Sequence, residues 1–366
     1  MNNIRRSFCT AVFAVALCSI AASNAQTAPG VGIPTVPTNL PNIRTFLAPP
    51  ATFNPVAASA EALQQHGYPP CPDRLKAPAA YKAWAKAVSA PQTRLQSPKL
   101  EQTTVCNGPA RVFNGPARVV GNGTTAGNII ATNSSNWSAY VAYNHVVKPW
   151  AHGAIYAYWI VPVARQAFGT STGTWDYSSQ WVGLDGFASP DVLQAGTEAD
   201  AVDGTSSFYA AWVEWYPLNE ARISNFVVSP GDEMFVQVWN TSPTVGNAYL
   251  LNVTTQQAVS LTFDAASGTS LKGDSVEWVV ERPSLGGSLA TLTNYVACPF
   301  DACYAFGFVG GGTFNKDYYP GMNTAVLASN TTIYELSMLD SNNAVISVPS
   351  LVGPADLWFR DSGPAY

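Results

Sequence analysis

The segment from Asn136 to the C-terminus is built of short runs in which apolar and polar residues alternate. These runs are rich in Val, Tyr, Trp and Thr, and turn sequences such as SPGD (229–232), AASGT (265–269) and SNNA (341–344) separate them. Because side chains alternate between the two faces of a β-strand, a period of two predicts strands, and long helical periodicity is absent. The pattern predicts one all-β domain over 131–366, a sandwich or a barrel.

The N-terminus has the pattern of an export signal. Arg5 and Arg6 precede an apolar run from Phe8 to Ile20, and small residues follow up to Ala25. We therefore predict a secretory signal peptide over 1–25 and export to the periplasm or the medium. No later run is long and apolar enough to cross a bilayer, so we expect no membrane partner.

Residues 26–130 differ from the β-rich segment in charge. They hold nine Lys and Arg against three Asp and Glu, a net charge of +6, whereas 131–366 holds seven against twenty, a net charge of −13. Two short helical patterns occur, at 59–67 and 79–88, and a turn-rich linker follows over 107–130, in which NGPARV occurs twice. One interpretation is a disordered basic tail. We favour a partly helical prosegment that inhibits the acidic domain of its own chain and is removed by cleavage within 107–132.

The charge difference also predicts how the prosegment is held. We expect the helix that carries Lys82, Trp84 and Lys86 to lie over the acidic face of the β domain. Acid protonates Asp and Glu but leaves Lys and Arg charged, so we expect the attraction to weaken as the pH falls, and salt to screen it.

Four cysteines remain after removal of a signal peptide, an even number that suits an oxidising compartment. Cys298 and Cys303 are close enough in sequence to close a short loop, and Cys71 and Cys106 would then pair within the prosegment. The crossed pairing is left open. No CxxC spacing occurs, so we expect no cysteine metal site.

Four of the expected strands have one face that combines carboxylates, an amide, aromatic rings and glycine, without Lys or Arg. Strand by strand, these faces are Trp181, Gly183 and Asp185; Gln194, Gly196, Glu198 and Asp200; Trp212, Glu214 and Tyr216; and Glu277 and Glu281. An ordinary solvated face of an antiparallel sheet is an alternative. Aromatic residues beside glycine favour a substrate groove, because glycine lets another backbone approach closely.

Carboxylate chemistry is what remains for such a groove. The three histidines, His66, His145 and His152, accompany no GxSxG or HExxH motif, so neither a nucleophile–histidine pair nor a metal site is expected. Crowded carboxyl groups hold protons to a higher pH than a free Glu, which suits hydrolysis in acid. Three interpretations follow: a glycosidase using Glu277 and Glu281, a peptidase in which one Glu activates water and an amide binds the oxyanion, and a non-catalytic carbohydrate-binding sandwich.

Five stretches in one order resemble the landmarks of the glutamic peptidases, the eqolisin family. They are QWVGLDG (180–186), LQAG (193–196), AWVEWYP (211–217), SPGDEM (229–234) and VEWVVERP (276–283). Asn136-Trp137 similarly resembles the start of the family's mature domain. The resemblance implies a two-sheet antiparallel β-sandwich, a concanavalin-like jelly roll, made with a removable basic prosegment.

By the same resemblance, Gln194 and Glu281 form the catalytic dyad. Glu281 would move protons between water and the leaving amine, and Gln194 would bind the oxyanion. The residues that would line the groove are Trp137, Trp181, Asp185, Glu198, Trp212, Glu214 and Tyr216, with Glu277 as a neighbour that tunes the pKa of Glu281. Glu198 stands where the family usually has Asp. We expect a secreted, monomeric endopeptidase that acts on proteins or peptides in acid, without cofactor, metal or nucleic acid.

Overall fold

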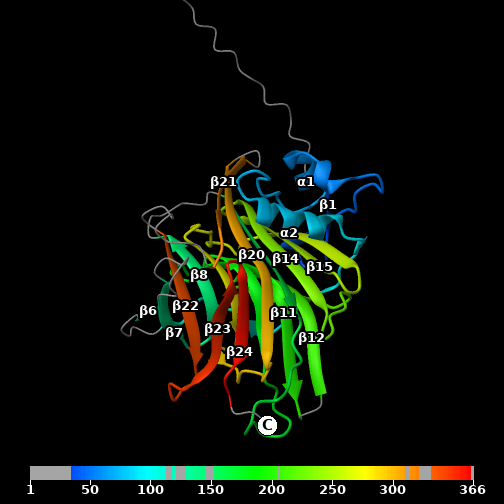
Figure 1. The fold of residues 1–366 in the computed structure, drawn as a ribbon. Coiled ribbons are helices and arrows are strands. Elements are labelled where there is room, and N and C mark those ends of the chain that lie inside the picture. The colour runs from blue at the N-terminus through cyan, green and yellow to red at the C-terminus, as the bar shows by residue number, and fades with distance from the viewer. Residues whose placement is uncertain are drawn as a thin grey trace, which may run out of the picture. The chain divides into compact units, whose positions relative to one another are not determined.

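The strands form two antiparallel layers that are connected along one edge (Figure 1). The computed structural model describes residues 34–112, 118–120, 129–144, 152–203, 206–309, 313–320 and 331–363. The predicted signal peptide lies outside the described residues, as does much of the linker over 107–130. Within these ranges, no helix has the length and hydropathy that a membrane span requires.

One layer, the helix-covered sheet, carries the helices on its outer face. Its strands, in spatial order, are β16 (Gln257–Asp264), β15 (Val245–Asn252), β14 (Glu233–Ser242), β9 (His152–Ile160) and β20 (Ala297–Val309). The other layer, the carboxylate sheet, has the order β22 (Thr331–Leu339), β8 (Trp137–Asn144), β17 (Ser275–Glu281), β10 (Ser179–Leu184), β11 (Val192–Val202), β12 (Ser206–Tyr216) and β13 (Ala221–Ile223).

Shorter strands complete and connect the layers. From β22, β23 (Val345–Gly353) and β24 (Asp356–Asp361) lead across to β20. Peripheral strands are β7 (Ile129–Ser134), which is parallel to β22, β6 (Arg118–Val120), which pairs with β7, and β21 (Thr313–Tyr318), which pairs with β20. A separate small sheet contains β5 (Val105–Cys106), β18 (Ser284–Leu285) and β19 (Ser288–Leu289).

The core lies between the two layers, where the apolar faces of the alternating strands meet. Val182, Leu193 and Trp278 from the carboxylate sheet pack into one cluster with residues such as Val236 of the helix-covered sheet. Each fully buried aliphatic side chain contributes about 1.5–3 kcal/mol. Hydrogen bonds cross the interface as well: the Trp278 indole donates to the Tyr156 carbonyl at 3.1 Å. The all-β, two-sheet sandwich predicted from the sequence is therefore confirmed.

The predicted prosegment contributes structure to both layers. Its elements up to residue 102 are β1 (Thr35–Pro37), β2 (Ile43–Phe46), the 3-10 helix η1 (Pro55–Ala57), α1 (Ala60–Gln65), α2 (Pro78–Ser89), β3 (Thr93–Arg94) and β4 (Leu100–Gln102). β2 and β3 pair with β16 and so extend the helix-covered sheet, whereas β4 pairs with β13 and extends the carboxylate sheet. A disordered tail is thus ruled out for the described part, and both predicted helical patterns are helices.

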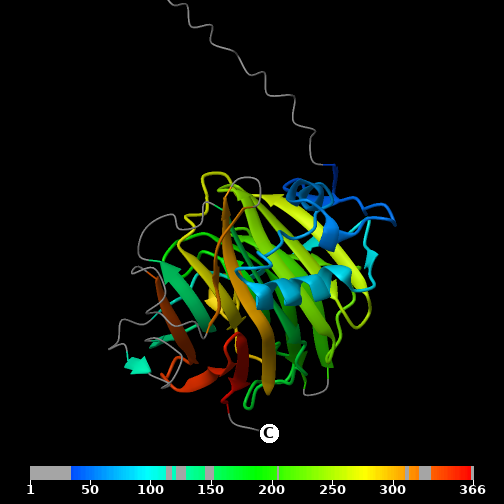
Figure 2. The ribbon, with the colours of Figure 1, turned by 45° about the horizontal axis from the view of Figure 1, so that its top comes forward.

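The position expected for the basic helix is wrong. Helix α2 lies across the outer face of the helix-covered sheet (Figure 2), on the far side of the sandwich from the groove carboxylates. Trp84 is fully buried there in a cluster with Tyr156 and Phe235, and the Tyr156 hydroxyl donates to the Ala80 carbonyl at 2.6 Å. The apolar side of α2 needs an apolar surface, and this aromatic face supplies it. The free energy gained by burying the apolar side of α2 therefore outweighs the long-range attraction between the basic prosegment and the acidic face.

The predicted disulfides are absent, since all four cysteines in the described residues are free. Cys298 and Cys303 lie on one strand, β20, and five residues of strand with a bulge span on the order of 13 Å, beyond the reach of a disulfide. Cys71 packs with the residues around α2, whereas Cys106 lies on β5 beside Glu214 of the carboxylate sheet. The two members of that predicted pair therefore lie against different sheets.

Candidate active site

The four faces that stood out in the sequence belong to one sheet and point the same way. β17, β10, β11 and β12 are consecutive neighbours, so the residues that alternation placed together also meet across strands. Gln194 is in register with Glu214 on one side and with Gly183 on the other, and Gly183 is in register with Glu277. Trp137 of β8 lies opposite Glu281. This shared surface is the outer face of the carboxylate sheet.

Glycine is required where Trp181 crosses the neighbouring strand. Gly196 is in register with Trp181, and a Cβ atom at this position would lie 2.1 Å from the Gln180 carbonyl oxygen and 2.6 Å from the Trp181 Cβ. Any larger residue would push away the backbone of Gln180 and Trp181. The Trp181 indole donates at 3.0 Å to Glu281 Oε2, so this small residue indirectly positions a carboxylate.

An extended segment of the predicted prosegment, residues 103–112, lies along this face and is here called the groove segment. Before Asn107 it is bound to Glu220, the residue that precedes β13: Thr103 N–H donates to the Glu220 carbonyl, and Glu220 N–H donates to the Val105 carbonyl, both at 3.1 Å. After Asn107, Ala110 N–H donates to the Gly186 carbonyl at 3.0 Å. The segment is therefore bound through its backbone on both sides of Asn107, as a peptide ligand is.

The peptide bond between Asn107 and Gly108 contacts both members of the predicted dyad. The Gln194 side-chain amide donates to the Asn107 carbonyl oxygen, and Gly108 N–H donates to Glu281 Oε1 at 3.2 Å. The Gly108 carbonyl instead accepts from the Trp137 indole at 3.0 Å. Gln194 and Glu281 thus hold the two ends of a single peptide bond.

Glu281 is fully buried, and its carboxylate has two further contacts that fix its orientation. Asn136 Nδ2 donates to Oε1 at 3.1 Å, and the Trp181 indole donates to Oε2. Burial raises the pKa of Glu281 well above its ordinary value, and the hydrogen bonds from Asn136, Gly108 and Trp181 oppose this rise. Asn136 was not predicted as a site residue, although its place before Trp137 was noted.

Comparison with known proteins identifies the family of this chain. Residues 119–347 match the model of the Peptidase A4 family. The chain belongs to this family. It is 36% identical over 124 residues to aspergillopepsin-2 of Aspergillus niger, and this match covers 34% of this chain and 44% of that protein. It is 38% identical over 112 residues to scytalidopepsin B of Scytalidium lignicola, covering 30% of this chain and 42% of that protein. The matches therefore span less than half the length of these relatives.

Solved structures of peptidases give similar matches. A scytalido-glutamic peptidase with a transition-state analogue inhibitor has a TM-score of 0.48 and 24% identity, covering 62% of this chain and 98% of that chain. The aspergilloglutamic peptidase from Aspergillus niger has a TM-score of 0.41 and 25% identity, covering 51% of this chain and 99% of that chain. The resemblance to the eqolisins noted in the sequence is thus confirmed by the family match.

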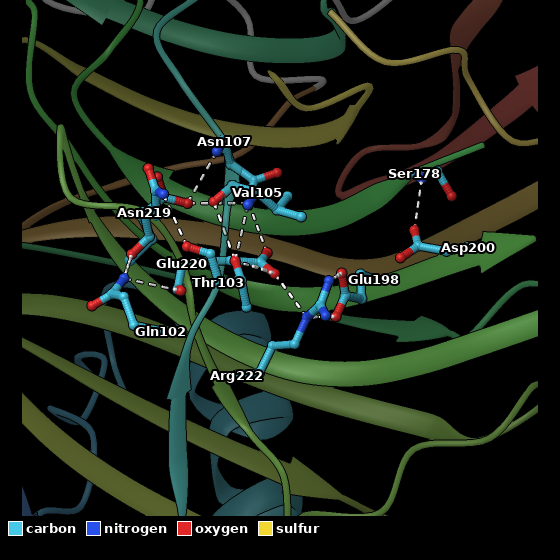
Figure 3. Close-up of polar contacts among 11 residues, drawn as sticks. Gln102, Thr103, Val105, Asn107, Ser178, Glu198, Asp200, Asn219, Glu220 and Arg222 are labelled. Carbon is cyan, nitrogen blue, oxygen red and sulfur yellow. Dashed lines mark hydrogen bonds and ion pairs between the residues drawn. The ribbon is translucent and has the colours of Figure 1, made fainter. Parts of the chain in front are cut away.

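A cluster of carboxyl groups binds the side chain of Asn107 in this A4-family chain (Figure 3). Glu214 Oε2 accepts from both Asn107 N–H and Asn107 Nδ2 at 3.1 Å, and Glu220 Oε2 accepts from Asn107 Nδ2 at 3.2 Å. Burial, with the charge of Glu198 added, raises the pKa of Glu220 to about 8. Glu220 was missed because it lies in the turn after β12, outside any alternating run.

One guanidinium partly balances this cluster. Arg222 Nη2 donates to Glu198 Oε2 at 2.7 Å, and Arg222 Nε donates to Glu220 Oε1 at 2.9 Å. Burial raises the pKa values of Glu198 and Asp200 well above ordinary, and Arg222 opposes both rises. Glu198, a predicted groove residue, therefore does not contact Asn107 directly. It binds Arg222, which binds Glu220, and Glu220 accepts from the Asn107 side chain.

Of the remaining predicted groove residues, two aromatic side chains lie in the groove, and one carboxylate binds a loop at its edge. Tyr216 packs against Gly108, and Trp212 is buried in the same aromatic cluster as Trp137 and Trp181. Asp185 lies at the end of β10, where its carboxylate accepts backbone N–H groups from residues 272–275, so it holds a loop at the edge of the groove.

Glu277 is buried without a hydrogen-bond partner among the described residues. Burial raises its pKa well above ordinary, with Asp185 adding to the rise. The dominant influences on the pKa of Glu281 come from burial and from its own hydrogen-bond donors, so a tuning role for Glu277 stays a prediction.

Proposed function

We propose that the chain is the precursor of a secreted, acid-acting endopeptidase in which Glu281 and Gln194 form the catalytic dyad. The observation that supports this most directly is their contact with one peptide bond: the amide of Gln194 lies at its carbonyl oxygen, and the carboxyl group of Glu281 lies at its nitrogen. These are the two atoms that gain negative charge and a proton when an amide is hydrolysed.

The reaction follows from these positions. Ionised Glu281 takes a proton from a water molecule as its oxygen attacks the carbonyl carbon. The carbonyl oxygen becomes an oxyanion, to which Gln194 Nε2 donates. Glu281 then gives the proton to the peptide nitrogen, the C–N bond breaks, and a carboxyl group and an amine are formed. Trp181 and Asn136 keep the Glu281 carboxylate aimed at this bond during both transfers.

Activity in acid has a physical reason in this cluster. Glu214 contacts the backbone of the residue whose carbonyl becomes the oxyanion, so a negative charge on Glu214 or Glu220 would oppose that oxyanion. Burial raises the pKa of both groups, to about 8 for Glu220, so both keep their protons to a higher pH than a free Glu does. Turnover should fall as they ionise, and it should also fall below the pKa of Glu281, which burial raises, because protonated Glu281 cannot serve as a base.

Three substitutions test the dyad, with hydrolysis of an acid-denatured protein and cleavage of the chain itself as readouts. Glu281→Gln keeps size and removes the base, so both activities should fall by orders of magnitude. Gln194→Ala removes one oxyanion donor and should cost about 10²–10³ in rate. Glu277→Gln makes the same chemical change on the same strand and should have a much smaller effect.

Folding of each variant is checked by circular dichroism before its rate is compared. Near-normal turnover in Gln194→Ala together with loss of turnover in Glu277→Gln would reject the dyad. That result would favour the pair of carboxylates that the glycosidase interpretation uses, which β-glucan hydrolysis would then reveal.

A further inference from the structure

We propose that Asn107–Gly108 is the bond that this protein cuts in its own chain, and that the carboxyl groups of Glu214 and Glu220 select it by binding the Asn107 side chain. The inference rests on the proposed function, because it uses the same dyad. It adds which bond is cut, which side chain is recognised and how the precursor is positioned.

The neighbouring peptide bonds of the groove segment do not meet the same contacts. In the bond before, Asn107 N–H donates to Glu214 and not to Glu281. In the bond after, the Gly108 carbonyl is held by the Trp137 indole, and the nitrogen belongs to Pro109, which has no N–H. Only at Asn107–Gly108, within the described residues, do Gln194 and Glu281 contact one bond.

The position of that bond is fixed from both directions. On its N-terminal side, β4 is paired with β13, and the backbone of Thr103 is bound to Glu220. On its C-terminal side, Arg111 N–H donates to Asn136 Oδ1 at 2.9 Å, and Asn136 Nδ2 donates to the Pro109 carbonyl at 3.1 Å. A slip by one residue would break these pairings, so the register of the segment determines which bond meets the dyad.

The side chains flanking the bond fit their surroundings chemically. Asn107 is completely buried, and its Nδ2 donates to a carboxyl oxygen of Glu214 and to one of Glu220. An aliphatic side chain of equal size would leave those buried oxygens without this donor. A Cβ atom at position 108 would lie 3.2 Å from the Tyr216 ring, so glycine fits closely on the other side of the bond.

The cut itself needs only water in addition to the groups present. Water oxygen bonds to the Asn107 carbonyl carbon while Glu281 accepts the water proton. The C–N bond to Gly108 then breaks, with its electron pair on nitrogen, and Glu281 returns the proton there. The products are a fragment that ends in the Asn107 carboxylate and a chain that begins with the Gly108 amine.

The sequence supplies an internal control for this proposal. The hexapeptide NGPARV occurs at 107–112 and again at 114–119. If sequence alone directed the cut, both Asn–Gly bonds would be cleaved alike. If the register in the groove directs it, the first copy should be cut and the second should not.

The experiment uses purified precursor moved from neutral to acid pH, with intact-mass analysis and N-terminal sequencing over time. We expect a new N-terminus at Gly108 and a fragment that ends at Asn107, with neither in Glu281→Gln. Asn107→Leu should slow this cut by at least tenfold, whereas Asn114→Leu, the same change in the second copy, should leave its rate unchanged.

Hydrolysis of a denatured protein, followed in parallel, separates the two proposals. The wild-type protein could hydrolyse denatured protein through its dyad and yet, after self-cleavage, have an N-terminus other than Gly108. That result would overturn this inference and leave the proposed function standing. Equal rates for Asn107→Leu and wild type would overturn the recognition by Glu214 and Glu220. Absence of both self-cleavage and hydrolysis of denatured protein would overturn the proposed function as well.

Discussion

At the scale of single residues, Glu220 couples the stability of the fold to pH. Its pKa is 4.5 ordinarily and about 8 in the folded chain, chiefly because it is buried. The folded state therefore binds this proton more tightly than the unfolded chain, and the resulting stability is present below pH 4.5 and is lost as the pH rises towards 8. We expect the Glu281→Gln precursor, which cannot cut itself, to melt at a lower temperature at about pH 8 than at about pH 5.

Glu220→Gln in the same background isolates the contribution of this group. Each pKa unit is worth about 1.4 kcal/mol, so the loss of stability between about pH 5 and about pH 8 should shrink by at least about 1 kcal/mol. An unchanged difference between the two pH values would contradict the raised pKa of Glu220.

At the scale of elements, helix α2 is held by burial more than by charge. Trp84 is fully buried against the helix-covered sheet, whereas Lys86 forms a half-exposed ion pair with Glu233 at 2.8 Å. Trp84→Ala should destabilise the docked helix by about 3–5 kcal/mol, and Lys86→Ala by less than about 1 kcal/mol. Hydrogen exchange of residues 78–89 in the Glu281→Gln precursor measures the destabilisation that each substitution causes. A larger effect from Lys86→Ala than from Trp84→Ala would show that charge holds the helix, as expected from the sequence.

At the scale of the whole molecule, the predicted prosegment is part of both sheets. β2 pairs with β16 and β4 with β13, while ion pairs such as Arg44–Asp264 at 2.7 Å lie at the partly exposed surface. Surface ion pairs contribute little and are screened by salt, whereas sheet pairing and burial are not. We therefore expect about 1 M NaCl at neutral pH to leave residues 34–112 of the Glu281→Gln precursor protected from an added protease.

Size-exclusion chromatography extends this test to the cut protein. After self-cleavage, the fragment that ends at Asn107 should still elute with the remainder of the chain at neutral pH. Release of the fragment by salt alone would show that net charge holds the prosegment, as the sequence suggested.

Local sequence pattern by itself determined the strands, their faces and both helices, α1 and α2. Alternation with a period of two placed Trp181 with Asp185, Gln194 with Glu198 and Glu277 with Glu281 on common faces, because the extended backbone itself turns successive side chains to opposite sides. Helical periodicity likewise predicted α2 and its apolar side. The family landmarks then indicated Gln194 and Glu281.

Tertiary structure alone decided which of these faces meet and what fills the space above them. The partners of Asn107, namely Gln194, Glu214 and Glu220, lie 87 to 113 residues away in the chain, and no local period encodes such distances. The same limit explains the errors: charge totals do not say which sheet α2 covers, and sequence spacing does not say how far apart Cys298 and Cys303 lie. Side-chain direction is a property of the local backbone, whereas strand neighbours, register and the fit of Asn107 to its carboxyl groups depend on the packing of the entire sandwich.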